Sequence, residues 1–232
     1  MMGAAKDADA WIGVRPQFLG GFDSRELKSI VGTAAQLQYS AKSVVISQGD
    51  PASRLFLLTE GRARYFYLTQ QGRKILLPWI LPGEVFGAGA LFLHRASSYL
   101  VSAEIVKDSC VLAWERTKLW SLAERYPRLL ENALSIASYY LTWALTAHIG
   151  LACHSARLRL AQTLVDLARA IGHKTPGGVE LHVTNEELAN AANVTVFTVS
   201  RLMSEWHRRG ALVKYYKKVL LRSPERLFSP KV

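Results

Sequence analysis

The segment from residue 184 to residue 210 has the clearest pattern of apolar and polar positions in the chain, that of two short helices joined by a tight turn. Thr184 and Glu187 have the spacing of a capping box, which satisfies two main-chain N–H groups where a helix begins. Thr195 is a suitable N-cap for a second helix, which we expect to end at Gly210. One face of this second helix is apolar, with the i, i+3, i+4, i+7 spacing of a buried stripe: Val199, Leu202, Met203 and Trp206. The pattern predicts a helix-turn-helix.

The opposite face of the second helix is mostly polar, as in a helix that reads the DNA major groove. Residues 212–215 and 218–222 can pair as a hairpin after this helix, which predicts a winged helix-turn-helix. The predicted DNA-binding residues are Thr184, Thr195, Val196, Phe197, Ser200, Arg201, Ser204, Arg208, Lys217 and Lys218. Two alternatives stay open: an ordinary helical hairpin in a core, and inward packing of Phe197.

Residues 39–115 contain short runs rich in β-branched and aromatic residues, separated by turn-forming pairs. These pairs are Gly49-Asp50, Glu60-Gly61, Gln71-Gly72 and Pro82-Gly83. Several short strands at this spacing predict a small antiparallel β-barrel or roll. A short helix is expected at residues 113–124, directly after the last strand.

A long helix is expected after Pro127, and residues 133–153 of it carry no formal charge. Its Ser, Thr, Tyr and His content makes it less apolar than a membrane-spanning helix normally is. One face has heptad spacing, which predicts a symmetric dimer seam of Leu129, Ala133, Ile136, Tyr140, Trp143 and Ala147. A second face is predicted to cover a neighbouring domain of the same chain: Leu130, Leu134, Leu141 and Leu145. Burial of the whole helix in one monomeric core is the alternative.

Charge supports a nucleic-acid partner. The chain of 232 residues has a formal net charge of +11. Residues 155–232 hold 13 Lys and Arg against 6 Asp and Glu, whereas residues 1–154 hold 16 against 12. Most of the positive excess therefore accompanies the predicted helix-turn-helix, as expected of a segment that neutralises phosphates. Cys110 and Cys153 are too few for a disulfide framework, and the N-terminus lacks a signal pattern, so a reducing cytoplasm is expected.

Three segments resemble one known family when they are taken in order. They are KSVVISQGDPASRLFLLTEGRARYFYLTQQGRKILLPWILPGEVFGAGALF (Lys42–Phe92), RLAQTLVDLA (Arg159–Ala168) and the predicted helix-turn-helix. Together they resemble the Crp/Fnr family of bacterial transcription regulators. The resemblance implies an α+β chain with a sensory antiparallel β-roll, similar to a cupin-like jelly roll, at residues 1–126. A dimerisation helix at 127–154 and a winged helix-turn-helix at 155–232 would follow.

The resemblance also implies a homodimer that binds double-stranded DNA at a two-fold-related operator and controls transcription. RNA polymerase is a further candidate partner. The start of the recognition helix departs from the family's usual Ser-Arg-Glu-Thr-Val, because Val196 and Phe197 replace the Arg and Glu. These two residues can touch a thymine methyl group but cannot form a bidentate pair with a base. Arg201 stands at the family's second base-reading arginine.

The effector pocket departs from the family as well. In members that bind cyclic nucleotides, a Gly-Glu pair holds the ribose and a later Arg-Ser pair grips the phosphate. Gly83-Glu84 aligns with the first pair, but Ser97-Ser98 stands at the second, so the arginine is missing. A phosphate would lose its charge-assisted contact there. Arg95 could replace it only if the loop were rebuilt.

The family's polar pair on the dimer helix, which meets the base, aligns with Ala144 and Leu145, whose side chains cannot hydrogen-bond. The candidate pocket residues are therefore Gly83, Glu84, Arg95, Ser97, Ser98, Ala144 and Leu145. We expect no ordinary cAMP response. A different small-molecule effector and a regulator without a ligand both stay open, and no cofactor is expected.

Other chemistries find little support in the sequence. An iron–sulfur cluster needs about four cysteine ligands, and this chain has only Cys110 and Cys153. A haem would need an axial ligand, for which the candidates are His94, Cys110, His148 and His154. The phosphate loop, the HExxH motif and the GxSxG motif are all missing, so we expect no enzyme, no catalytic residues and no metal site. The alternative function is a sensor or scaffold of the same fold that does not bind DNA.

Overall fold

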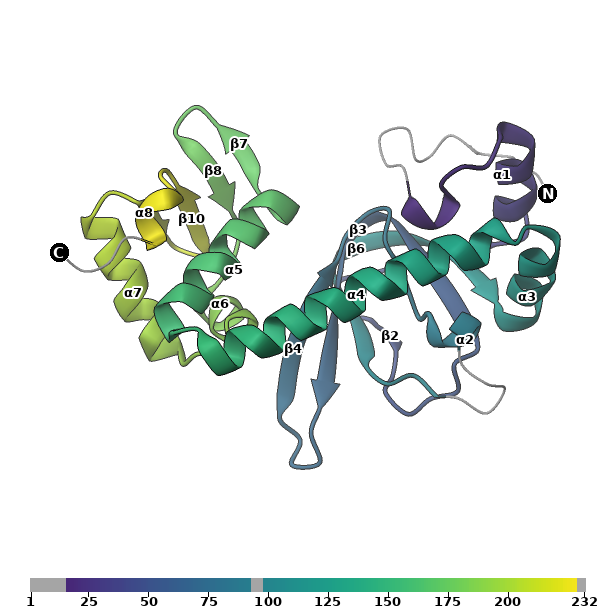
Figure 1. Ribbon diagram of the computed structural model, residues 1–232, viewed down its shortest axis with the longest axis horizontal. Helices are drawn as coiled ribbons and strands as arrows, with labels where there is room; N and C mark the ends of the chain where they lie inside the picture. The colour runs from purple at the N-terminus through teal and green to yellow at the C-terminus, as the bar shows by residue number, and fades with distance from the viewer. Residues whose placement is uncertain (1–15, 93–97, 229–232) are drawn as a thin grey trace. The chain divides into compact units, whose positions relative to one another are not determined.

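The computed structural model describes residues 16–92 and 98–228 of the chain (Figure 1). The chain divides into two compact units, Met1–Leu141 and Thr142–Val232. Helix α4 (Arg128–Cys153), the long helix of Figure 1, runs without a break across this boundary. The fold is of the mixed class that the sequence predicts, with an antiparallel sheet first and a helix-turn-helix last.

The first unit is built on an antiparallel sheet in the order β1-β6-β3-β4, with β2 paired to β6 and β5 paired to β3. The strands are β1 (Ala35–Tyr39), β2 (Val44–Ile46), β3 (Arg54–Leu68), β4 (Lys74–Ile80), β5 (Val85–Phe86) and β6 (Ser102–Glu115). The long strands β3 and β6 pair along most of their length and form the centre of the sheet. This arrangement confirms the predicted antiparallel architecture.

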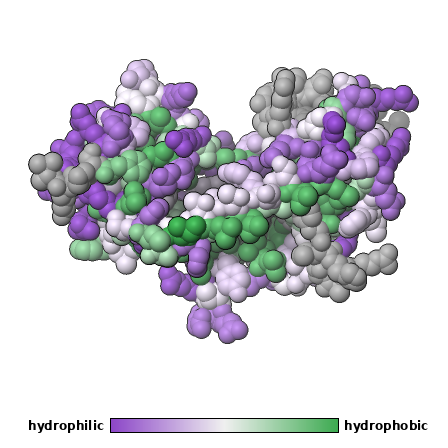
Figure 2. Space-filling view, viewed as in Figure 1, coloured by the Kyte–Doolittle hydropathy of each residue, from purple (hydrophilic) through white to green (hydrophobic). Residues whose placement is uncertain are grey.

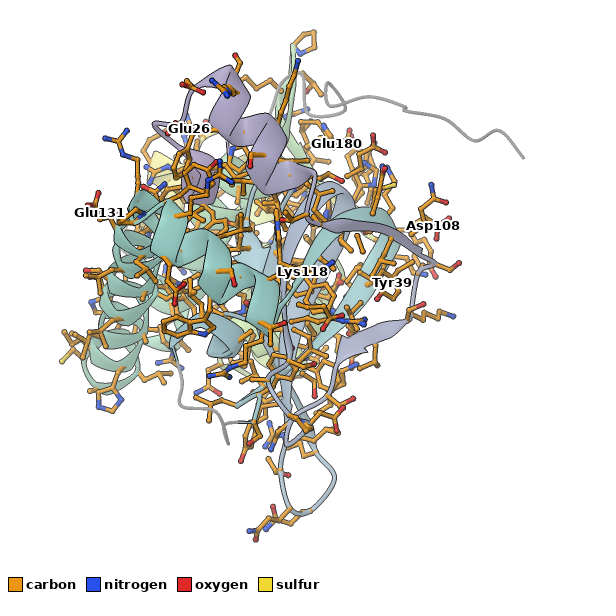
Figure 3. All side chains as sticks on the ribbon, turned by 90° about the vertical axis from the view of Figure 1, so that its right-hand side faces the viewer. Glu26, Tyr39, Asp108, Lys118, Glu131 and Glu180 are labelled. Atoms are coloured by element: carbon orange, nitrogen blue, oxygen red, sulfur yellow. The ribbon has the colours of Figure 1, made fainter. Side chains whose placement is uncertain are left out.

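The turn predicted at Glu60-Gly61 is wrong. Strand β3 continues through these residues, and the pairing register with β6 shifts on either side of Glu60. Gly61 has a φ of 91°, and a Cβ there would lie 2.2 Å from Ser109 Oγ and 2.4 Å from the main-chain oxygen of Asp108 (labelled in Figure 3). The glycine therefore marks a bulge where two strands approach closely. By contrast, Gly49, Gly72 and Gly83 lie outside the strands and have φ values of 91°, 75° and 93°.

Short helices flank the sheet. They are η1 (Gln17–Leu19), α1 (Ser24–Val31), α2 (Gly89–Phe92) and α3 (Arg116–Arg125). Asp23 caps α1 by accepting hydrogen bonds from the N–H groups of Arg25 and Glu26, both at 2.8 Å. Helix α3 begins three residues later than predicted, because Ala113 is still paired within the sheet, to Ala35 and to Phe56.

The described residues of this unit form two apolar cores. One gathers the N-terminal helices, the start of α4 and one part of the sheet around Trp114, whose indole N–H donates to the main-chain oxygen of Ile30 at 3.0 Å. The other fills the roll around Phe56 and Phe86, whose rings stack with their centroids 5.0 Å apart. Burial on this scale supplies most of the stability of such a unit.

Helix α4 buries the first part of the face predicted as a dimer seam, while Trp143 and Ala147 of that face are exposed. Leu129 is fully buried and belongs to the first core, with Ile136 packed against it, so a seam that includes Leu129 is wrong. The leucines expected to be covered are the exposed ones: Leu134 (67%), Leu141 (62%) and Leu145 (55%). Figure 2 shows apolar side chains along this helix. Heptad spacing fits either face, and only the position of the roll core decides which one is buried.

The second unit is a winged helix-turn-helix, as predicted. Its elements are α5 (Ala156–Ile171), β7 (His173–Thr175), β8 (Gly178–Leu181), α6 (Asn185–Ala191), α7 (Val196–Arg208), β9 (Leu212–Tyr215), β10 (Lys218–Leu221) and α8 (Glu225–Phe228). The four strands form an antiparallel sheet in the order β7-β8-β10-β9. Among the described residues, no helix combines the length and apolar character needed to cross a bilayer.

Candidate nucleic-acid interface and effector pocket

Both helices of the helix-turn-helix begin at the predicted caps. The hydroxyl of Thr184 accepts the N–H of Glu187 at 3.1 Å, and the Glu187 carboxylate accepts the N–H of Thr184 at 2.8 Å. The turn passes through Asn193, which has a φ of 48°. Thr195 then caps α7 by accepting the N–H of Thr198 at 3.1 Å. These local bonds fix where the recognition helix starts and how it leaves the turn.

Helix α7 has one buried and one exposed face. The predicted apolar stripe is buried, each side chain at 2% exposure or less: Val199, Leu202, Met203 and Trp206. At the start of the helix, Val196 is 47% exposed and Phe197 is 78% exposed. Phe197 is therefore not packed inward, and this alternative is wrong. Ser200, Arg201 and Arg208 are exposed as well, so the helix offers an apolar tip followed by polar and basic groups.

Two predicted contact residues already have partners within the unit. The Ser204 hydroxyl donates to the main-chain oxygen of Ser200 at 2.8 Å and accepts from Lys214 Nζ at 3.0 Å. Lys218 Nζ lies 2.7 Å from a carboxylate oxygen of Glu180 (labelled in Figure 3). The hydrogen bond from Lys218 lowers the pKa of Glu180 below its ordinary value. Lys217 has no such acidic partner among the described residues.

The candidate effector pocket begins at a tight turn. Gly83 donates its N–H to the main-chain oxygen of Leu58 at 2.8 Å. The Glu84 carboxylate accepts the N–H of Leu81 at 2.9 Å and thereby closes its own turn. Burial raises the pKa of Glu84 above its ordinary value, against the opposing effect of that hydrogen bond. Glu84 thus has a local structural role, whatever else it binds.

The other candidate pocket residues come from two further segments of the chain, residues 95–98 and helix α4. Arg95 and Ser97 lie outside the described residues. Ser98 is half-buried and forms an isolated β-bridge with Pro51. Ala144 and Leu145 are exposed residues of α4 and belong to the second unit.

The two units match known family models separately. Residues 36–126 match the cyclic nucleotide-binding domain, and residues 158–228 match the Crp-like helix-turn-helix domain. The chain is 27% identical to the transcriptional regulator LdrP of Thermus thermophilus over 79% of this chain and 90% of LdrP. This protein belongs to the Crp/Fnr family. It is a DNA-binding transcriptional regulator of that family.

Other Crp/Fnr proteins extend the similarity. The CRP-like cAMP-activated global transcriptional regulator of Mycobacterium tuberculosis is 24% identical over 90% of this chain and 94% of its own length. The c-di-GMP responsive regulator CLP of Xanthomonas campestris superposes with a TM-score of 0.75 at 21% identity, covering 86% of this chain and 99% of CLP. FixK2 of Bradyrhizobium japonicum gives 0.71 at 23% identity, covering 84% and 95%. The two structures establish the shared fold.

Arg159 is a residue of this Crp/Fnr protein whose role the sequence does not reveal. Its guanidinium donates to three main-chain oxygens: from Nη1 to His154 at 2.8 Å, from Nε to Ala192 at 3.1 Å, and from Nη2 to Asn193 at 3.0 Å. One side chain therefore ties the segment after α4 to the turn that precedes the recognition helix. A fork of donors is the chemistry that distinguishes Arg from Lys at such a position.

The sequence pattern did not predict two tyrosines, one of strand β3 and one of helix α4, as neighbours of Glu84. Tyr65 of β3 is partly buried. Burial raises its pKa well above the ordinary value, and the nearby Tyr140 and Glu84 raise it further. Burial likewise raises the pKa of Tyr140 of α4, with a second contribution from Glu84. Heptad spacing assigned Tyr140 to a dimer seam. Spacing along a helix does not show that this side chain lies near Glu84.

Proposed function

We propose that this Crp/Fnr regulator binds a two-fold-related operator as a homodimer through the exposed face of α7. The observation that carries the proposal is the exposed face itself, with Phe197 and Arg201 in solvent above a fully buried stripe. The proposed organisation is a sensory roll at residues 1–126, a dimerisation helix at 127–154 and a DNA-binding domain at 155–232.

Sequence reading is proposed to rest on Arg201 and Phe197. Arg201 is exposed, forms no ion pair within residues 16–92 and 98–228, and has the fork of donors that pairs with O6 and N7 of guanine. Phe197, at 78% exposure, offers a large apolar surface to a thymine methyl group. The operator is therefore expected to combine a guanine with a neighbouring thymine in each half-site.

The homodimer is proposed to form along α4. Its exposed leucines Leu134, Leu141 and Leu145 are spaced by seven and four residues, as in a helix–helix seam. Trp143 is 43% exposed and Ile149 is 56% exposed on the same helix. An apolar surface of this extent on a DNA-binding chain favours a second copy as its cover.

The roll is proposed not to act as an ordinary cAMP receptor. Ser97 stands where the phosphate-binding arginine is expected. The Glu84 carboxylate already accepts a hydrogen bond from the N–H of Leu81 in its own turn. Tyr65 and Tyr140 beside it are neutral groups that cannot replace a cation. A different effector and a ligand-independent regulator are both compatible with this site.

The test of DNA reading begins with duplexes selected by the protein from a random pool. We expect Arg201→Ala to lose about 5- to 150-fold in affinity for the selected duplex, equivalent to about 1–3 kcal/mol, and little for a scrambled one. Lys217→Ala should weaken binding to both duplexes equally, because a phosphate contact carries no sequence information. Equal losses on both duplexes for Arg201→Ala would overturn its role, and a wild-type protein that retains no DNA at low salt would favour the scaffold alternative.

A further inference from the structure

The tip of the wing combines an exposed aromatic ring with a strained cationic residue. Strands β9 and β10 pair with Tyr215 opposite Lys218, so the loop consists only of Tyr216 and Lys217. Tyr216 is 87% exposed. Lys217 has a φ of 53°, in the left-handed region, and its ammonium group lies 5.2 Å from the centroid of the Tyr216 ring.

This loop is not the most stable choice for a two-residue hairpin. Glycine or asparagine would adopt this positive φ with less strain than a lysine does. A large ring almost fully in water contributes little to the stability of the folded chain. Strain of this kind is concentrated where the side chains have a binding role.

The wing is held in a fixed position relative to the recognition helix. Lys214 of β9 donates to Ser204 of α7 at 3.0 Å, and Ala211 donates its N–H to the main-chain oxygen of Trp206 at 3.0 Å. Leu212 and Val219 of the wing strands are buried. When α7 lies in a major groove, the wing tip must therefore reach a defined neighbouring part of the duplex.

We infer that Tyr216 is a further DNA-contacting residue, with its ring against the sugars of the minor groove that flanks each half-site. Lys217 would neutralise an adjacent phosphate. A ring beside an ammonium group matches this surface, because sugars offer apolar edges and phosphates offer charge. The inference rests on the proposed DNA-binding role of α7. The inference assigns different roles to the two wing lysines, because Lys218 is already paired with Glu180. Glu180 also accepts a bond from His182 at 2.8 Å.

The test compares two duplexes that carry the same selected operator, one with long flanks and one trimmed to the half-sites. We expect Tyr216→Ala in the full-length protein to lose about 10-fold in affinity on the long duplex, in the range found when an aromatic ring loses its stacking on nucleic acid. The loss should largely vanish on the trimmed duplex, and Tyr216→Phe should retain most of the affinity. Tyr215→Ala, a change of the same size on the neighbouring strand, is the control and should alter binding less than twofold.

Salt dependence supplies a second readout that damage to the fold would not produce. Lys217→Ala should reduce the slope of log affinity against log salt by about one, whereas Lys218→Ala should leave it nearly unchanged. Unchanged binding of Tyr216→Ala on the long duplex, or an equal loss on both duplexes, would overturn the inference. If the Tyr216 result is negative but the wild type still prefers the operator through Arg201, the proposed function stands and only the inference about Tyr216 is wrong. If the wild type shows no preference for the operator, both the proposed function and the inference are wrong.

Discussion

At the scale of single residues, the ion pairs of one carboxylate in the roll, that of Glu104, are expected to stabilise the fold. Glu104 of β6 is 8% exposed, and its carboxylate accepts from Arg64 Nε at 2.6 Å and from Lys74 Nζ. Burial alone would raise the pKa of Glu104, but the hydrogen bonds from Lys74 and Arg64 outweigh it and hold the pKa below the ordinary value. No sequence pattern indicates this group, because its three members come from three different strands.

We expect Glu104→Gln to lower the free energy of unfolding by about 2 kcal/mol at pH 7, less than for a fully buried pair because Lys74 is partly exposed. Since the folded-state pKa is lowered, this stabilisation is full above the unfolded-state pKa and is lost as the pH falls through the folded-state value. Urea unfolding from pH 7 toward pH 3 should therefore bring wild type and variant together. Glu115→Gln, which breaks an exposed pair with Arg54, should cost less than about 0.5 kcal/mol. A difference that stays constant with pH would contradict the assignment.

At the scale of elements, local patterns predicted the helix-turn-helix well and the roll less well. The caps Thr184 and Thr195 and the buried stripe of α7 depend on residues a few positions apart, so the sequence contains the whole signal. The bulge at Gly61 and the buried face of α4 depend on strands and cores that are distant in sequence. Periodicity found the two faces of α4 but could not say which one meets the roll.

The exposed face of α4 makes the dimer testable. We expect Leu141→Arg to raise the dimer dissociation constant by at least about 100-fold, because each protomer would place an unpaired charge in an apolar seam at a cost of roughly 3 kcal/mol. Sedimentation at micromolar concentration measures this change. Glu131→Arg, an exposed substitution near the start of the same helix, should leave the dimer intact. A Leu141→Arg protein that sediments as wild type would place the seam elsewhere.

At the scale of the whole molecule, this Crp/Fnr protein combines a match to the cyclic nucleotide-binding domain with a Crp-like helix-turn-helix. Residues 36–126 match the cyclic nucleotide-binding domain, and the Glu84 carboxylate accepts the N–H of Leu81. Ser97 is proposed to stand where the family has a phosphate-binding arginine. A buried phosphate without a cation is strongly disfavoured. We therefore propose that operator binding does not depend on a cyclic nucleotide.

The most direct test is the affinity for a selected operator duplex, measured at one salt concentration with nucleotide-free protein and again with saturating cAMP or cGMP. Calorimetric titration of each nucleotide alone should accompany it. We predict that the protein binds the operator without any nucleotide, about 10³-fold or more tighter than it binds a scrambled duplex. Either nucleotide should change this affinity less than twofold. A micromolar dissociation constant for cAMP, together with a rise of tenfold or more in operator affinity, would contradict it.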